Sequence, residues 1–211
     1  NTAVFTGDGS SGIYIWGAQV VTQSFLTSYI PTTGSAVTRN QDIFTRDGIG
    51  SLINSTEGVL FAEIAALAND GVNKFICLSD GTISNRINII FDTSNNISGR
   101  QAPGSVNITT SGVNILNSNK IAYKYKSGNQ ELWVNGLKVG TASVTNLPSG
   151  LNRLNFDSFN GGDNFYGKVK QLQVYKTALT DNQLIQLTGE AGTHFFESYA
   201  EMAEALTYTI Q

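Results

Sequence analysis

Apolar and polar residues alternate with a period of two between residues 120 and 140, the pattern of strands with one buried face. Ile121, Tyr123 and Tyr125 are separated by single residues, and Asn135-Gly136 follows the next predicted strand at 130–134, which carries Leu132 and Val134 on one face. Asn-Gly is the dipeptide that suits a two-residue type I′ turn, since both positions need a positive φ. The segment therefore predicts antiparallel strands joined by tight hairpins.

A second signal lies between residues 151 and 189, where the pattern predicts a strand at 151–156, a loop at 157–164, a strand at 165–175 and a helix. In the second strand Val169 and Leu172 are three residues apart, which predicts a β-bulge near Lys170-Gln171. The helix starts with the capping-box pattern of Thr180 and Gln183 and stops at Gly189.

The chain between residues 57 and 110 contains short β-type runs separated by turn sequences rich in Asn, Asp, Ser and Gly. The predicted strands are 58–64, 73–79, 86–92, 97–101 and 106–110. Turns at this interval favour an antiparallel sandwich over a parallel sheet. The fold class predicted from the pattern is all-β.

Four motifs resemble those of the laminin-G-like (concanavalin A-like lectin/glucanase) jelly roll. They are the runs Leu132-Trp133-Val134-Asn135-Gly136, Phe165-Tyr166-Gly167-Lys168-Val169, Leu172-Gln173-Val174-Tyr175 and Ala178-Leu179-Thr180-Asp181. The resemblance implies two antiparallel sheets packed face to face, with loops at the rim that often bind sugar and sometimes calcium. It covers residues 56–189, and short C-terminal helices complete the predicted fold.

Four segments are expected along the chain. Residues 1–22 are predicted to be the terminal strand of an upstream domain, 23–55 a linker that wraps the sandwich, 56–189 the jelly roll, and 190–211 a helical extension. The runs 15–20 and 25–32 resemble the closing strand and exit linker of carbohydrate-binding-like domains in phage tail and virion proteins. In the extension, Tyr199, Met202 and Leu206 form an apolar stripe that would pack on the sandwich or on a partner chain.

Composition narrows the classes of partner. Charged residues make up 14% of the chain and the formal net charge is −3, which gives no basic footprint for nucleic acid. No apolar run approaches the length of a membrane span, so membrane insertion is not expected. Cys77 is the only cysteine, which excludes an intrachain disulfide, and its apolar neighbours predict an inert buried thiol.

The sequence lacks the residues that hydrolases of this fold need. Retaining glycoside hydrolysis requires two carboxyl groups close together, and the resemblance implies a Glu-x-Asp-x-x-Glu strand that is absent here. The nearest strand carries Glu63 alone, and the only histidine is His194, beside Phe195-Phe196. The chain is predicted to be non-enzymatic.

The best candidate for a ligand site is the loop Asp157 to Asn164. Asp157, Asn160, Asp163 and Asn164 offer carboxylate and amide oxygens to a sugar, and Asp157 and Asp163 are the candidate ligands of a calcium ion. The alternative hypothesis is that this loop is an ordinary turn with no ligand.

Two roles are possible for each of three further side chains. Arg86 and Arg100 are expected either to present guanidinium groups to an acidic sugar or to keep an edge strand soluble. Trp133 is assigned to packing, with a sugar platform as the alternative.

The function predicted from these observations is glycan binding or adhesion by a phage tail or virion module, located in the virion outside the cell. Its expected partners are cell-surface polysaccharide and other virion subunits, and a homo-oligomer is left open. The alternatives are a purely structural virion assembly domain, or a module of a bacterial adhesin that is secreted or displayed on the cell surface.

Overall fold

The computed structural model describes residues 6–20, 28–37 and 43–190 and divides the chain into two compact units, 1–41 and 42–211. No strand or helix is assigned to residues 6–20 or 28–37 of the first unit. Trp16 and Tyr29 contact each other there with ring centroids 4.8 Å apart. The assignment of residues 1–22 to an upstream domain stays a prediction.

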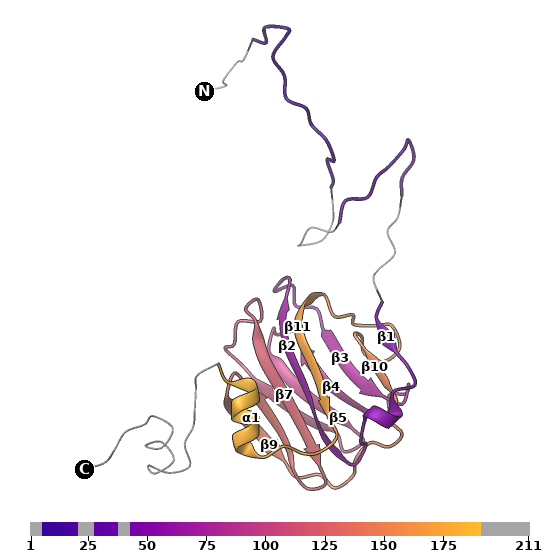
Figure 1. The fold of residues 1–211 in the computed structure, drawn as a ribbon, viewed down its shortest axis with the longest axis vertical. Coiled ribbons are helices and arrows are strands. Elements are labelled where there is room, and N and C mark those ends of the chain that lie inside the picture. Colours follow the sequence, from indigo (N-terminus) through magenta and orange to yellow (C-terminus); the bar gives the residue numbers. More distant parts are fainter. Residues whose placement is uncertain (1–5, 21–27, 38–42, 191–211) are drawn as a thin grey trace, which may run out of the picture. The chain divides into compact units, whose positions relative to one another are not determined.

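The second unit is a sandwich of two antiparallel sheets (Figure 1). The six-stranded sheet has, in spatial order, the strands β1 (Thr45–Arg46), β10 (Arg153–Asn155), β3 (Lys74–Ser79), β4 (Arg86–Phe91), β5 (Ile97–Ala102) and β6 (Val106–Thr110). The other sheet has five strands in the order β11 (Gly167–Tyr175), β2 (Glu57–Ala66), β7 (Asn119–Lys126), β8 (Gln130–Val134) and β9 (Leu137–Ala142). The predicted all-β, two-sheet antiparallel fold is confirmed.

Two local predictions are confirmed with it. The register of β11 on β2 shifts between Val169 and Gln171, so Lys170 is the bulged residue. Asn135 and Gly136 have φ angles of 50° and 83°, as a type I′ hairpin between β8 and β9 requires.

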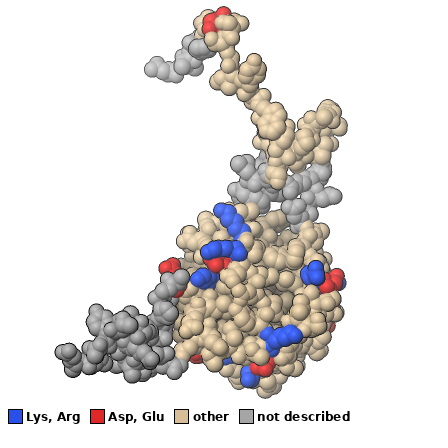
Figure 2. Space-filling model, viewed as in Figure 1, with Lys and Arg blue, Asp and Glu red and all other residues tan. Residues whose placement is uncertain are grey.

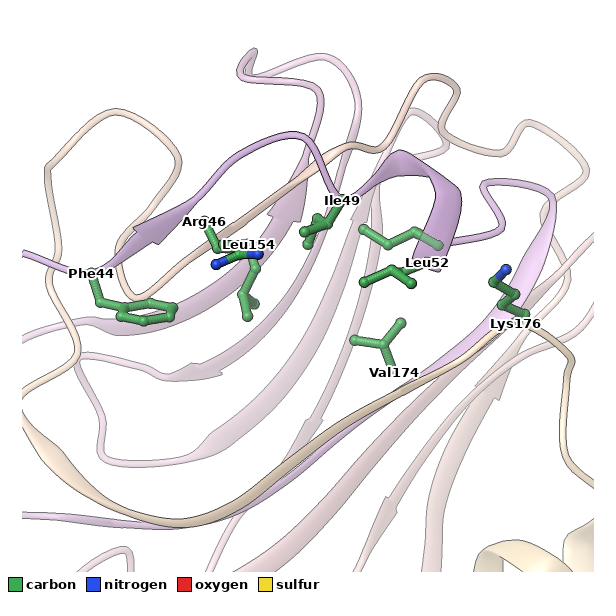
Figure 3. Close-up of a pocket in the computed structure, with 8 residues that line it drawn as sticks. Phe44, Arg46, Ile49, Leu52, Leu154, Val174 and Lys176 are labelled. Atoms are coloured by element: carbon green, nitrogen blue, oxygen red, sulfur yellow. The ribbon is translucent and has the colours of Figure 1, made fainter.

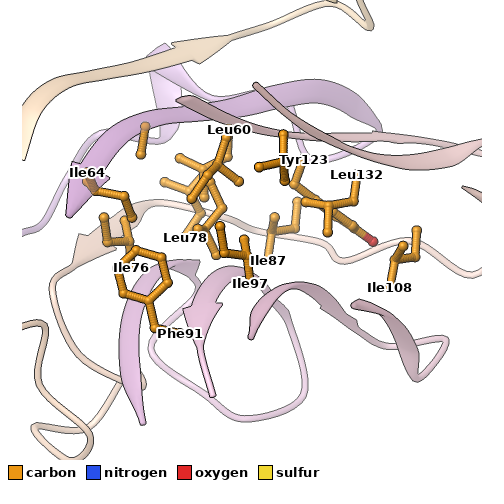
Figure 4. Packing of buried hydrophobic residues seen from close by; sticks show 14 of the residues in the cluster. Leu60, Ile64, Ile76, Leu78, Ile87, Phe91, Ile97, Ile108, Tyr123 and Leu132 are labelled. Carbon is orange, nitrogen blue, oxygen red and sulfur yellow. The ribbon is translucent and has the colours of Figure 1, made fainter. Parts of the chain in front are cut away.

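The core lies between the sheets, where alternate residues of both layers meet (Figure 4). Leu60 and Ile64 of β2 point toward Ile76 and Leu78 of β3, and all four are almost fully buried. Near the middle of the sandwich, Gly99 of β5 packs so closely on Tyr123 of β7 that a Cβ at this position would lie 2.3 Å from Cδ2 of the ring. A glycine is therefore required for the sheets to approach here.

A helix covers the outer face of the five-stranded sheet. Helix α1 (Asp181–Thr188) begins with the predicted capping box of Thr180 and Gln183 and packs Leu184 against Val59, Phe61 and Trp133. Trp133 is 3% exposed, which confirms its assignment to packing. The second helix predicted near residues 198–211 lies outside the described residues.

The segment that precedes β2 lies against the sandwich through β1 and the 3-10 helix η1 (Gly50–Leu52). Thr45 and Arg46 pair with β10, and the ring of Phe44 lies edge-on to that of Phe156. The domain boundaries proposed from the sequence remain predictions.

The visible surface is poor in charge, and the charged side chains that it does carry lie in small groups (Figure 2). Among the described residues, no helix has the length and apolar character needed to cross a bilayer.

Candidate functional site

The outer face of the six-stranded sheet carries a row of five polar side chains and one cysteine that crosses all six strands. The strand register aligns one residue from each strand, and their chain neighbours, such as Leu154, Leu78 and Ile87, face the core. In spatial order the row is Thr45, Asn155, Cys77, Asn88, Arg100 and Asn107. We refer to these six residues as the polar row.

Two amides of the polar row have unpaired oxygens. Asn88 and Asn155 are 1% and 2% exposed. The Oδ1 atom of each has no hydrogen-bond partner among the described residues. A buried amide oxygen is costly without a donor, so such atoms normally accept a hydrogen bond from a protein group or from an ordered water molecule. In the polar row Thr45, Arg100 and Asn107 are therefore accessible to a ligand, whereas Asn88, Asn155 and Cys77 are covered.

Arg86 lies on the same outer face, two residues along β4 from Asn88. Its Nη1 donates to the carbonyl oxygen of Ser158 at 3.3 Å, and its guanidinium carbon lies 5.2 Å from the centroid of the Phe159 ring. These contacts fix the guanidinium group between the sheet and the loop that follows β10. One of the predicted arginines is thus brought together with the predicted loop.

Arg100 occupies the polar row itself, on β5 beside Asn88. Its Nε donates to Oδ1 of Asn107 at 3.0 Å. The Cα atoms of Arg86 and Arg100 are on the order of 8 Å apart, as two residues along a strand and one strand spacing require. Neither guanidinium group forms an ion pair within the described part of the chain.

The loop 157–164 is held together mainly by its own hydrogen bonds. Asp157 is 1% exposed, and its Oδ1 accepts the backbone N–H of Phe159 at 2.6 Å. The hydroxyl of Ser158 donates to the carbonyl of Gly162, and the Oδ1 of Asn160 accepts the N–H of Gly162. Phe159 has a φ of 102°, an unusual conformation for a bulky residue, which these contacts and Arg86 maintain.

The predicted ligand residues of this loop differ in accessibility. Asn160 and Asp163 are exposed and Asn164 is partly exposed, with its Nδ2 donating to the carbonyl of Gly161. The carboxylate of Asp157 points inward, toward Asn155. Three of the six predicted site residues, Asp157, Asn160 and Asn164, therefore make side-chain hydrogen bonds within the loop itself, and Asp157 is the buried one.

The fit of calcium to Asp157 and Asp163 can be judged from the donors present. Calcium takes six to eight oxygen ligands, whereas no group of three or more His, Cys, Asp or Glu side chains gathers anywhere in the described ranges. The backbone carbonyl of Asp163 accepts the N–H of Phe75, and the carboxylate of Asp157 accepts the N–H of Phe159. A calcium ion at Asp157 would have to compete with these bonds, and calcium binding stays a prediction.

Cys77 lies at the centre of the polar row and is fully buried. Burial raises the pKa of its thiol to about 12, so it stays protonated at neutral pH. This confirms the inert buried thiol expected from its apolar neighbours.

Glu63 lies on the opposite sheet, on the outer face of β2. Its Oε1 accepts a hydrogen bond from Nζ of Lys170 at 2.8 Å and another from the hydroxyl of Ser118. The hydrogen bond from Lys170 holds the pKa of Glu63 below its ordinary value, which keeps the carboxylate ionised and unsuited to act as a general acid near neutral pH. His194 lies outside the described residues.

Arg86 and Arg100 are among the residues predicted from the sequence, whereas Asn88 and Asn155 are not. The alternation in Arg86-Ile87-Asn88-Ile89 puts Asn88 on the opposite face of the strand from the isoleucines, so the sequence could have predicted that Asn88 shares a face with Arg86. Alignment with Asn155 depends on the register of β10, β3 and β4, which are far apart in sequence. Only the folded structure reveals that the two amides share one row.

No protein-family model matches the chain, and the search of curated proteins gives no match. The structure is similar to the CBM40 domain of the Ruminococcus gnavus IT-sialidase, with a TM-score of 0.56, 15% identity, and coverage of 69% of this chain and 98% of that one. That domain has also been solved bound to α2,3-sialyllactose.

Two further structures have the same fold. Domain 4 of AbnA, a GH43 extracellular arabinanase from Geobacillus stearothermophilus in complex with arabinotriose, matches with a TM-score of 0.55 and 13% identity over 71% of this chain and 82% of that one. A heptameric SAP-like pentraxin from Limulus polyphemus matches with a TM-score of 0.51 and 12% identity over 67% of this chain and 73% of that one.

These likenesses define the fold as a concanavalin A-like β-sandwich, the class that includes carbohydrate-binding modules and a pentraxin.

Proposed function

We propose that this chain is a non-enzymatic glycan-binding module that binds a carboxylate-bearing sugar on the outer face of its six-stranded sheet. The observation that carries the proposal is that Arg86 and Arg100 lie close together on the outer faces of the paired strands β4 and β5, around Asn88. In this arrangement the guanidinium groups bind the carboxylate, and the buried oxygen of Asn88 is reached by a sugar hydroxyl group through a bridging water molecule. Phe159 provides an apolar ring beside the same site.

The comparisons support glycan binding at the level of the fold. Structural neighbours have been solved with sialyllactose and with arabinotriose, one an acidic and the other a neutral sugar. The arginines favour the acidic class for this chain, since a neutral sugar offers no charge to pair with them. Sequence identities of 13–16% to these neighbours support a shared fold. That this chain binds an acidic glycan is our proposal.

Isothermal titration calorimetry with a panel of glycans tests the proposal. The panel contains α2,3-sialyllactose, other carboxylate-bearing oligosaccharides, and the neutral sugars lactose and arabinotriose. We expect at least one acidic glycan to bind, and the affinity to fall by about tenfold or more in each of Arg86→Ala and Arg100→Ala, which corresponds to about 1.4 kcal/mol. Lys168→Ala is the matched control, since Lys168 is exposed on β11 of the other sheet.

The outcomes separate the alternatives. Binding of neutral sugars alone, unaffected by the arginine variants, would replace the acidic class with a neutral one. Absence of binding across the panel would reject the glycan-binding function. The non-enzymatic part is tested by product analysis after long incubation with laminarin and with α2,3-sialyllactose, and cleavage that disappears in Glu63→Gln would contradict it.

A structural role in assembly is the second candidate, and one observation favours it. Five large apolar side chains of residues 13–20 are exposed by 83% or more: Ile13, Tyr14, Ile15, Trp16 and Val20. A run of this kind is typical of a surface that binds another protein. Sedimentation velocity of the chain and of Trp16→Ser tests this role, which requires a concentration-dependent oligomer that the substitution weakens.

The virion setting is part of the proposal and rests on the resemblance of residues 15–32 to phage tail and virion proteins. A secreted or surface-displayed bacterial adhesin is the alternative location. Mass spectrometry of purified virions from the source that encodes the chain decides between them. Detection of its peptides at a fixed stoichiometry is the expected result, and their presence only in the secreted or cell-surface fraction favours the adhesin.

A further inference from the structure

An apolar groove runs along the side of the sandwich where β1 and β11 are the edge strands of their sheets. It has a volume of about 710 Å³, and its apolar walls include Phe44, Ile49, Leu52 and Val174 (Figure 3). Phe44 and Leu52 are 52% and 60% exposed. The groove is separate from the polar row, whose side chains face away from the core.

Two cationic side chains stand at this groove. Arg46 of β1 and Lys176, just after β11, both line it and are both exposed. Among the residues that the structure describes, neither forms an ion pair. An occupant that matches the groove therefore combines large apolar side chains with carboxylates.

The segment 190–211 of the same chain has this chemistry. It contains Glu190, Glu197, Glu201 and Glu204 and no lysine or arginine, so its charge is opposite to that of the groove. Between the glutamates it carries large apolar residues, namely Phe195, Phe196, Tyr199, Met202 and Leu206.

The segment is also long enough to reach the groove. It begins two residues after helix α1, which packs on β7 and β8. In the five-stranded sheet β8 lies three strand spacings from β11, about 14 Å at about 4.8 Å each. Gly189 contacts Lys120, which lies three residues, or about 10 Å, along the strands from the level of Val174, so the total separation is about 17 Å. The eight residues 190–197 span up to about 26 Å when extended.

We propose that the groove between β1 and β11 is the docking site of the acidic segment 190–211 of the same chain. The apolar residues of the segment fill the groove, and Glu197, Glu201 and Glu204 provide partners for Arg46 and Lys176. The segment thereby covers apolar surface at the open side of the sandwich.

Hydrogen exchange of the full chain tests this docking through the backbone amides of residues 43–55. We expect these amides to exchange at least about tenfold faster in Glu197→Lys/Glu201→Lys/Glu204→Lys than in the wild type, a factor that corresponds to about 1.4 kcal/mol of docking free energy. Arg46→Glu/Lys176→Glu is expected to have the same effect, and combining both sets of reversals restores slow exchange. Lys168→Glu, exposed elsewhere on β11, is the matched control and leaves the exchange unchanged.

A second variant tests the docking without any substitution in the sandwich. Met202→Asp/Leu206→Asp alters only the segment, and it is expected to accelerate exchange at residues 43–55 without changing the melting temperature by more than the control does. Equal exchange in all variants, or failure of the combined reversals to restore it, would reject the docking. Slow exchange that depends on protein concentration and accompanies a dimer would assign the groove to the segment of a second copy and overturn the proposal.

Discussion

The guanidinium group of Arg86 lies over the ring of Phe159, 5.2 Å from its centroid, and donates to the neighbouring Ser158 carbonyl at 3.3 Å. Arg86 comes from β4, whereas Phe159 belongs to the loop after β10. The contact therefore joins the face of the sheet to the loop, and it orients one of the two arginines on which the proposed glycan site depends.

Replacement of Arg86 by lysine keeps the charge but removes the planar fork. We expect Arg86→Lys to bind an acidic glycan about tenfold more weakly than the wild type, because an ammonium cannot make the paired hydrogen bonds of a guanidinium group with a carboxylate. Calorimetric titration measures the loss. An affinity equal to that of the wild type would show that Arg86 acts as a point charge or lies outside the site.

The close contact between Gly99 and Tyr123 predicts a sensitive position in the core. Gly99→Ala is expected to lower the free energy of unfolding by about 1–3 kcal/mol, because the added methyl group would overlap the buried ring. Urea denaturation followed by circular dichroism measures this. Gly12→Ala is the control, since nothing lies within 4 Å of a Cβ at that position, and equal effects of the two substitutions would contradict the packing argument.

The ion pair of Lys124 and Glu131 is buried on the outer face of the five-stranded sheet, with Nζ and Oε1 3.3 Å apart and side-chain exposures of 7% and 5%. The Oε2 of Glu131 also accepts the indole N–H of Trp133 at 2.8 Å. Glu131→Gln is expected to cost about 3 kcal/mol, because it leaves the ammonium buried without a counter-charge.

The exposed pair of Lys126 and Glu57 provides the comparison. Its Lys126 side chain is 55% exposed, and Lys126→Met is expected to cost less than about 1 kcal/mol. Urea denaturation of both variants under the same conditions gives the difference. A cost for Glu131→Gln as small as that for Lys126→Met would contradict the assigned burial.

Glu63 predicts a modest dependence of stability on pH. Lys170 lowers the pKa of Glu63 in the folded chain, so the folded state binds this proton less readily than the unfolded state does. The stabilisation is present above the unfolded pKa of about 4.3 and is lost as the pH falls through the folded pKa.

Lys170→Met removes the main cause of this shift. We expect it to move the pKa of Glu63 toward its ordinary value and to reduce stability at pH 7 by less than about 1 kcal/mol, since Lys170 is 73% exposed. Titration of the Glu63 carboxyl resonance by NMR measures the shift. An unchanged pKa in Lys170→Met would show that the lowering has another origin.

Local elements of the fold were predictable because their signals are local. The bulge at Lys170, the type I′ turn at Asn135-Gly136 and the capping box at Thr180 each depend on residues within a few positions of one another. The site was less predictable. Arg86 and Arg100 stood out by their charge, but the alignment of Asn88 with Asn155 results from pairing between distant strands. The inward orientation of the Asp157 carboxylate depends on contacts that the loop makes only in the folded chain.

Mapping of chemical shifts by NMR during titration with the acidic glycan that binds most tightly is the sharpest test of glycan binding on the outer face of the six-stranded sheet. We expect the largest changes at the side-chain amide of Asn88, the Nε–H groups of Arg86 and Arg100, and the ring of Phe159, and we expect them to vanish in Arg86→Ala/Arg100→Ala. Changes that cluster instead on helix α1 or the five-stranded sheet, or that persist in the double variant, would contradict binding on this face.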